Sequence, residues 1–336
     1  WTTRVQHRHA GEGLRLARRA VTLISMQILK KLSALPENFP NYLGEMLPEY
    51  TVLYGECAAQ HYAATLEASL STTLAHPGVT AYGMVSKGDV IGMMIALMRY
   101  GVGEIVFVHV LQAHREQGLE ADLLRGCVEA LEQQGATRLV SETMPLYAVN
   151  LDAAFIAHDF QPIKRALMRR ALSHEDSLLA QGLTTPMSVE DEPAAALVLL
   201  DAYADHPDRV LHHELQQHDA SLSLLRRFRA GEFGAVPPEW MRVTRHQGGC
   251  SGLIMGHAIS DDTGYAFQLA VAPALQGQGI GRCLLQALVA KMAATGMQRM
   301  LLGVTLSNPA IVLYRDLGFS LVRTVAVYVR DEAPKK

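Results

Sequence analysis

The sequence predicts an α/β protein built from two copies of one domain, and three observations support this prediction. First, the stretch "VLQAHREQGLEADLL" from Val110 recurs as "VAPALQGQGIGRCLL" from Val271, 161 positions later, and the register holds for about 30 residues. Second, strand-like runs precede this stretch in both copies, and a helix, a strand, a short helix and a strand follow it. Third, the chain is 49% hydrophobic and 19% charged, as in proteins that bury a core.

The second copy begins with helices and a three-stranded meander. Apolar spacing predicts interrupted helices over 193–231. The runs "EWMRVTRH", "SGLIMGHAIS" and "YAFQLAVAP" then predict strands over 239–246, 251–260 and 265–273. The glycine-rich turn after the third strand opens a helix that we expect over 279–294.

The remaining elements of the second copy are a strand, a short helix and a final strand. The run "RMLLGVT" predicts the first strand, and "SLVRTVAVYVR" predicts the last. Between them, Pro309 suits a first helical turn and Gly318 suits the C-terminal cap of a short helix. The first copy repeats this order with "TAYGMVS", "DVIGMMIALMRY", "EIVFVHVL", a helix, and a final strand in "QPIKRALMRRAL".

The two copies are joined by a polar segment over 173–193 that Gly and Pro interrupt. We therefore expect two domains, with boundaries at 1–180 and 181–336.

Composition excludes several classes of protein. The net charge is -3, which gives no overall basic field for nucleic acid. Four scattered cysteines form no CxxC pair, so neither a zinc ribbon nor a disulfide framework is indicated, and the cytoplasm is the simplest location. No apolar run approaches the roughly 18 residues that could span a bilayer.

The first 35 residues form a basic segment, because seven Arg and Lys residues face a single acid, Glu12. Residues 13–35 could form a basic amphipathic helix that acts as a transit peptide, binds a membrane surface or docks a protein partner. The alternative is an exposed helix or strand of the first domain with a solvated basic face.

The turn from Gln276 to Gly281 follows a strand and opens a helix, and glycine removes side chains that would block close approach. The amide N–H groups at a helix start have no intrahelical partners, and with the helix dipole they suit a pyrophosphate. Neither GxGxxG nor a P-loop occurs. A glycine turn that serves packing alone is the other interpretation.

Ten residues of the second copy together resemble the GCN5-related N-acetyltransferase (GNAT) family, most strongly over about 240–330. They are Val271, Pro273, Gln276, Gly279, Gly281, Ala310, Leu313, Tyr314, Gly318 and Phe319. The resemblance implies tandem domains, each a mixed, mostly antiparallel sheet flanked by helices, with acetyl-CoA or another acyl-CoA in a split between the fourth and fifth strands. The implied cofactor-binding residues are Leu269, Ala270, Val271, Gln276, Gly277, Gln278, Gly279, Ile280, Gly281, Arg282, Ser307 and Asn308.

The resemblance also implies catalytic roles. Tyr314 is the implied proton donor for the departing thiolate, and backbone N–H groups near Ala270 polarise the thioester carbonyl. Where many relatives carry a glutamate base, this chain has Gln268, so we name His257 on the preceding strand as the candidate base. The further candidates for the base are Glu239, His246 and Asp262, and a chain of water molecules is an equal alternative.

Four histidines and Glu214 crowd the segment over 206–218. Its "HHELQQH" is not HExxH, and the spacing from His213 to His218 does not place both on one helical face, so we expect no metal site. These side chains either touch the acceptor or form a solvated helix face.

The first copy has lost its cofactor features. Glu116 and Glu120 stand where the second copy has Gly277 and Gly281, and they place negative charge where an anion would sit. Phe155 replaces the proton donor. We therefore expect this copy to be structural or to shape the acceptor site, an architecture similar to that of mycothiol synthase.

The predicted function is transfer of an acetyl group from acetyl-CoA to a small-molecule or peptide amine by the second copy. One alternative is a non-catalytic acyl-CoA sensor or scaffold. Another is acyl transfer to the thiol of an acidic carrier protein docked on the basic N-terminal segment.

Overall fold

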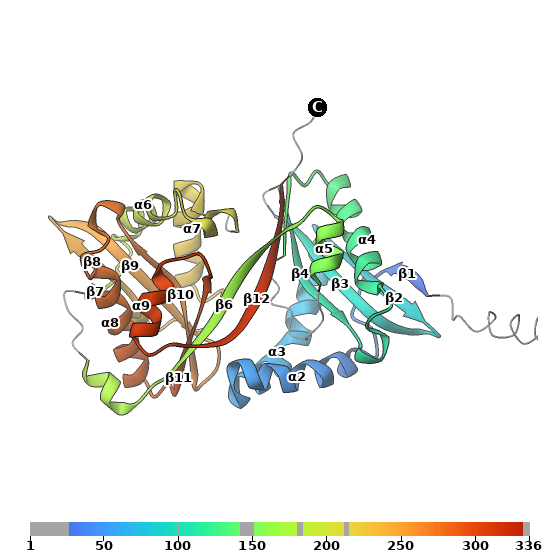
Figure 1. Ribbon diagram of the computed structural model, residues 1–336, viewed down its shortest axis with the longest axis horizontal. Coiled ribbons are helices and arrows are strands. Elements are labelled where there is room, and N and C mark those ends of the chain that lie inside the picture. The colour runs from blue at the N-terminus through green and yellow to red at the C-terminus, as the bar shows by residue number, and fades with distance from the viewer. Residues whose placement is uncertain (1–26, 100, 142–150, 180–183, 212–214, 332–336) are drawn as a thin grey trace, which may run out of the picture.

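The computed structural model describes residues 27–99, 101–141, 151–179, 184–211 and 215–331. Within them, one mixed sheet of 12 strands runs through the molecule, with helices on both faces (Figure 1). The strand order is β1-β2-β3-β4-β5-β12-β6-β11-β10-β9-β8-β7. This architecture confirms the predicted α/β fold of two related halves.

The first half contains the meander, the helix after the repeated turn and the closing strand that its sequence predicts. Its elements are β1 (Ile28–Lys31), α2 (Phe39–Tyr54), α3 (Glu56–Leu74), β2 (Val79–Ser86), β3 (Asp89–Arg99), β4 (Val102–Val110), α4 (Leu119–Gln133), β5 (Arg138–Ser141), α5 (Asp152–Ala157) and β6 (Gln161–Ala171).

The second half repeats the order of the first. Its elements are β7 (Thr184–Pro186), α6 (Glu192–Ala202), the 3-10 turn η4 (Pro207–Val210), α7 (His218–Arg229), β8 (Met241–His246), β9 (Gly249–Ala258), β10 (Thr263–Val271), α8 (Ile280–Ala294), β11 (Arg299–Thr305), α9 (Ala310–Asp316) and β12 (Ser320–Asp331).

The basic N-terminal segment lies largely outside the described residues, which begin at residue 27. Its described end is a strand, because β1 pairs antiparallel with β2 along its whole length. Lys30 and Lys31 on this strand are exposed, which agrees with a solvated basic strand over this part and not with a helix that continues to residue 35. No helix among the described residues is long and apolar enough to cross a membrane.

Both halves carry a β-bulge at equivalent places. Among the described residues, the parallel pair β4–β5 runs from Val102 to Ile105, and the pair β10–β11 runs from Thr263 to Ala266. One residue later, each longer strand carries a β-bulge, at Val106 in β4 and at Phe267 in β10, and these positions are also 161 apart. A bulge bends its strand and increases the local twist, and in the second half β10 and β11 diverge beyond it.

The two halves exchange their last strands. Strand β12 pairs with β5 of the first half, and β6 pairs with β11 of the second half, while β6 and β12 also pair with each other. Tyr328 on β12 therefore enters the first core, where its ring stacks on Phe155 with centroids 4.1 Å apart and its hydroxyl donates to Asp152 at 2.6 Å. Each half therefore takes its closing partner strands from the other, and the division at residue 180 stays a prediction.

Helices cover both faces of the second half. Along β9, Ile254 faces the core formed with α8, whereas Leu253 and Met255 face the core formed with α6 and α7. This alternation places two successive side chains on opposite faces of the strand. Trp240 is fully buried in the α8 core.

We expect Tyr328→Ala to lower the free energy of unfolding of the whole chain by about 3–5 kcal/mol, because it leaves a cavity in the first core. Trp1→Phe leaves Trp240 as the single tryptophan, so its fluorescence reports unfolding of the second half. In this background, denaturation of Tyr328→Ala should show the loss of stability through Trp240. Tyr328→Phe keeps the stacking and should cost only about 1 kcal/mol. An unchanged Trp240 midpoint in Tyr328→Ala would show that the halves unfold separately.

Candidate active site

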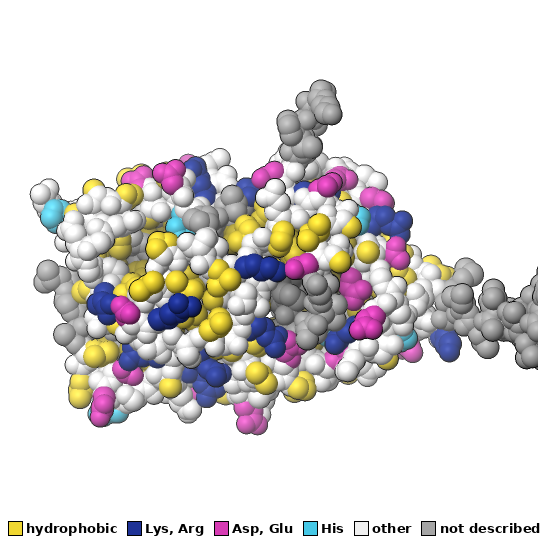
Figure 2. Space-filling view, in the orientation of Figure 1, with side chains coloured by type: hydrophobic (Ala, Val, Ile, Leu, Met, Phe, Trp, Pro, Cys, Tyr) yellow, Lys and Arg dark blue, Asp and Glu magenta, His cyan; other side chains and the backbone are white. Residues whose placement is uncertain are grey.

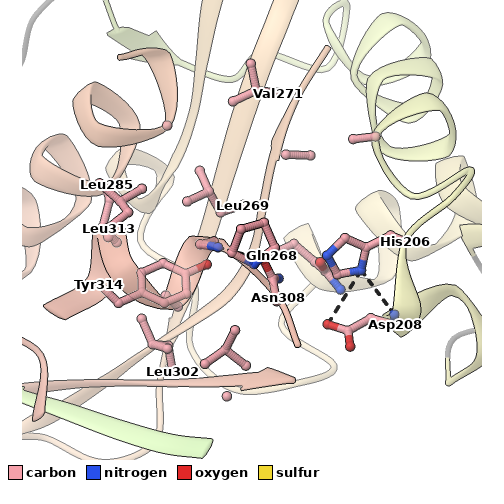
Figure 3. A pocket seen from close by; sticks show the side chains of 18 of the residues that line it. His206, Asp208, Gln268, Leu269, Val271, Leu285, Leu302, Asn308, Leu313 and Tyr314 are labelled. Carbon is pink, nitrogen blue, oxygen red and sulfur yellow. Dashed lines mark hydrogen bonds and ion pairs between the residues drawn. The ribbon is translucent and has the colours of Figure 1, made fainter. Parts of the chain in front are cut away.

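A cavity of about 690 Å³ opens in the second half where β10 and β11 diverge. The turn before α8 and the helix α9 border one side, and the segment after α6 borders the other (Figure 3). The sequence-predicted residues that line it are Leu269, Ala270, Val271, Gln276, Gly277, Gly279, Ile280, Gly281, Arg282, Asn308 and Tyr314. Gln278, Ser307 and His257 are not among its lining residues.

The glycine-rich turn presents bare backbone to this cavity. Gly277 and Gly279 adopt the left-handed region, with φ of 75° and 83°, and a Cβ on either would meet nothing within 4 Å. Gln276 fixes the turn, because its Nε2 donates to the carbonyl of Val271 at 3.1 Å. A Cβ on Gly281 would stand 3.7 Å from Leu313, which is ordinary contact, so internal packing does not require glycine there. The turn therefore leaves space and unpaired N–H groups for an anion at the start of α8.

The strand edge beside the turn is also open. Beyond Ala266, β10 keeps its pairing with β9 but no longer pairs with β11 among the described residues. Leu269, Ala270 and Val271 line the cavity along this edge. An open edge offers N–H and C=O groups that an extended ligand can bind as a further strand would.

Apolar surface adjoins the cavity on the α9 side. Hydrophobic side chains gather over α9 on the face shown in Figure 2, and Val312 is 58% exposed there. Leu306, just before α9, is 44% exposed. Arg282 at the start of α8 pairs with Asp316 at the end of α9, with 2.9 Å between Nη2 and Oδ2.

Tyr314 projects from α9 into the cavity (Figure 3). Its pKa is raised to about 12, mainly by burial and also by the nearby Asp208 and Tyr265, while Arg165 acts to lower it. Its ring packs edge-on against Phe319, with centroids 6.3 Å apart. At neutral pH the phenol is therefore protonated and can donate a proton inside the cavity.

Tyr203 and Gln268 form a buried pair on the opposite wall. The Tyr203 hydroxyl donates to Oε1 of Gln268 at 2.6 Å, and burial raises the pKa of Tyr203 above its ordinary value of 10.0. Gln268 is 7% exposed. An amide at this position cannot take a proton, but it accepts the phenol's hydrogen bond and holds this wall in place.

His206 and Asp208 line the cavity next to this pair (Figure 3). The backbone N–H of Asp208 donates to Nδ1 of His206 at 3.1 Å, and the Asp208 carboxylate lies 3.9 Å from the same nitrogen. Asp208 is 6% exposed, and its Oδ1 accepts a hydrogen bond from Thr305 at the end of β11. The histidine-rich segment pointed to His206, but no sequence signal singled out Asp208.

His257 lies elsewhere, in a second cavity of about 290 Å³ between α2 and α3 of the first half and the strands β9 and β10. Burial lowers its pKa to about 4, its Nδ1 lies 3.3 Å from the carbonyl of Ala258, and it packs against Phe228. The structure therefore does not bring the candidate base together with Tyr314. Tyr265 and Phe267 line both cavities and lie between them.

The other candidate bases are also outside the main cavity. Glu239 pairs with Arg242 at 3.2 Å, and Asp262 pairs with Arg299 at 3.2 Å. His246 is exposed at the end of β8. In the described part of the chain, no three His, Cys, Asp or Glu side chains could hold a metal ion, and residues 212–214 lie outside that part.

The equivalent turn of the first half keeps its shape but carries acids. Gly118 adopts φ of 76°, and Arg115 Nε donates to Val110 O at 2.9 Å, which repeats the bond made by the second turn's glutamine. Glu116 adopts φ of 65°, a region that favours glycine. Glu120 is 7% exposed, and its Oε1 has no hydrogen-bond partner among the described residues. A carboxylate thus occupies the start of α4, where the second half has open space at the start of α8.

Comparisons with known proteins agree with this geometry. The family model described as the acetyltransferase (GNAT) family matches residues 43–151 and 202–319, once in each half. A GCN5-related N-acetyltransferase from Sphaerobacter thermophilus is 15% identical, with a TM-score of 0.64 over 92% of this chain and 97% of that one. A tandem GNAT protein from the clavulanic acid biosynthesis pathway is 14% identical, with a TM-score of 0.58 over 93% and 100%. At these identities the solved structures show the fold, and the curated proteins contain no match.

We expect His257 to make the stability depend on pH. Its pKa is lower in the folded chain, near 4, than the unfolded value of 6.5, so the folded state binds fewer protons. Its contribution is complete above pH 6.5 and is lost as the pH falls toward 4, by about 3 kcal/mol. Urea denaturation at pH 7 and pH 4 should show a smaller loss in His257→Phe. The exposed control His246→Gln should behave as the wild type, and an equal loss in all three proteins contradicts the prediction.

Proposed function

The chain belongs to the acetyltransferase (GNAT) family, and from this we propose that its second half transfers an acetyl group from acetyl-CoA to an amine. One observation supports the proposal most directly. A single cavity brings together the bare glycine turn, the open edge of β10 and the phenol of Tyr314. The cavity thus places a proton donor beside a binding site that suits an extended, anionic thioester.

The residues present fit acetyl-CoA. The N–H groups at the start of α8, with Gly277, Gly279 and Gly281 around them, would hold the pyrophosphate, because the turn has no side chain in the way. The edge over 269–271 would hold the extended pantetheine arm through backbone hydrogen bonds. Bound there, acetyl-CoA supplies the thioester whose acetyl group is transferred.

Tyr314 acts as the general acid. It donates the proton of its hydroxyl to the sulfur that leaves as the C–S bond breaks. A phenol with a raised pKa keeps its proton until this step, and the buried surroundings favour the neutral phenol over the phenolate.

Asp208 and His206 take the place that sequence reasoning gave to His257. An amine enters as an ammonium ion, and its nitrogen can form the C–N bond only after a proton has left. The Asp208 carboxylate accepts this proton, and His206, whose Nδ1 accepts the backbone N–H of Asp208, lines the cavity beside it. Thr305 holds Asp208 at the end of β11, so the base stands at the opening between the strands.

The first half does not carry the reaction in this proposal. Glu120 fills its anion site with a carboxylate, and Phe155 is fully buried against Tyr328 where the second half has Tyr314. This half lacks both the cradle and the proton donor.

We expect Tyr314→Phe to lower kcat by at least about 10²-fold, the usual effect of removing a general acid. The Phe319 contact and the cavity shape remain, so calorimetry should give an unchanged Kd for acetyl-CoA. Release of CoA thiol from acetyl-CoA in the presence of a panel of amines measures turnover. Wild-type kcat in this variant would falsify the role of Tyr314.

We expect Gly281→Glu, which copies the first half, to weaken acetyl-CoA binding at least about 10-fold, because a carboxylate then faces the pyrophosphate at the start of α8. Gly281→Ala is the matched control, since a Cβ there makes only ordinary contacts and φ is not in the left-handed region. Calorimetric titration with acetyl-CoA separates the two variants. Equal Kd values for them contradict the proposed cradle.

A further inference from the structure

The cavity of the second half contains one charged side chain that the first half supplies. Arg165 lies on β6, next to Thr305 of β11 on one side and Val325 of β12 on the other. It lines the cavity together with Tyr314 and Asp208. The exchange of strands thus inserts a guanidinium from one copy into the site of the other.

The direction of Arg165 follows from the alternation of side chains along β6. The next residue, Ala166, is buried in the core beneath α8. Arg165 therefore points to the opposite face of the sheet. Its cross-strand neighbour Thr305 points to the same face and binds Asp208, so the guanidinium and the carboxylate share this face. The turn that would hold the pyrophosphate lies on the α8 side instead.

Arg165 lacks a counter-charge among the described residues. No Asp or Glu oxygen of these residues lies within ion-pair distance, and its Nε is buried with no hydrogen-bond partner. Its Nη2 donates only to the carbonyl of Gly303, at 3.4 Å. A guanidinium carries five donors in a fork that matches a carboxylate, and burying one without a partner is costly. Arg165 is therefore prepared to bind an anion.

The space around Arg165 is kept open by a glycine. A Cβ on Gly303 would stand 2.8 Å from the hydroxyl of Tyr265 and 3.6 Å from Nη2 of Arg165. Arg165 and Asp208 also act on Tyr314 with opposite sign, since Asp208 raises the pKa of Tyr314 and Arg165 lowers it. Both charges are thus close to the reacting group without neutralising each other.

We propose that the acceptor is an amine that also carries a carboxylate, and that Arg165 binds this carboxylate while Asp208 receives the ammonium. This inference rests on the proposed acetyltransferase function and names its acceptor class. Asp208 takes one proton from the ammonium, and the amine nitrogen then bonds to the acetyl carbon as the C–S bond breaks. The departing sulfur takes the proton of Tyr314, and the second proton of the amine nitrogen restores the phenol. Arg165 makes no bond and takes no proton; it orients the acceptor through a bidentate ion pair.

The test measures CoA thiol release with acetyl-CoA and two matched acceptor sets, the common L-amino acids and the corresponding amino-acid amides. With the wild type we expect kcat/KM for the best acid to exceed that for its amide by about 10²-fold. Arg165→Gln should lose about that factor for the acid, leave the amide unchanged and leave KM for acetyl-CoA unchanged. Lys164→Gln is the matched control, because this neighbour on β6 is exposed and pairs with Asp152 at 2.9 Å.

A second readout does not depend on turnover. Calorimetric titration of the best acid into the CoA-bound protein should show binding to the wild type and to Lys164→Gln, and none to Arg165→Gln. Equal kcat/KM for acids and amides, or equal loss for both in Arg165→Gln, would overturn this inference and leave the acetyltransferase proposal intact. Absence of thiol release with every amine would overturn both.

Discussion

The rest of the structure depends on the backbone hydrogen bonds that β6 and β12 make across the middle of the sheet. Each half supplies one closing strand, and in the described sheet each closing strand pairs with strands of the other half, so neither half has a complete sheet of its own. Tyr328 shows that this pairing carries side chains with it, because a residue near the end of the chain completes the first core. The same exchange places Arg165 in the second cavity. The pairing of β6 with β12 thus contributes both to the core of the first copy, through Tyr328, and to the cavity of the second copy, through Arg165.

Within this sheet, a β-bulge in β10 creates the site. The bulge at Phe267 ends the parallel pairing of β10 with β11, and the strands separate around a cavity. Both copies have this bulge, so the bulge alone does not distinguish the two halves. What differs is the chemistry at the helix start, where Gly281 leaves space and Glu120 fills it. The two copies share the backbone geometry of the bulge and the turn, and they differ in a few side chains such as those at positions 120 and 281.

Sequence reasoning predicted the features that are local in the chain. The repeat, the strand and helix order and the glycine turn follow from spacing, and Tyr314 follows from the family resemblance. The cavity is lined by these features and by most of the predicted binding residues. Sequence reasoning could not predict which strand pairs with which, because alternation identifies a strand but not its partner. From the sequence, Arg165 could therefore be assigned only to a strand of the first copy. His257 was named because it lies on the preceding strand and histidine ordinarily titrates near neutral pH. The face that it occupies depends on packing against α2 and α3, which the sequence does not encode locally.

The interleaved sheet has a consequence for how such a chain can change over evolutionary time. A descendant that lost the first copy would lose β6 with it, and β11 would keep an unpaired edge open to other chains. A descendant that lost the second copy would expose β5 in the same way. Once the two copies have exchanged their closing strands, loss of either copy leaves the other with an incomplete sheet. Under the proposed function, the first copy is retained because its strand β6 completes the sheet of the second copy.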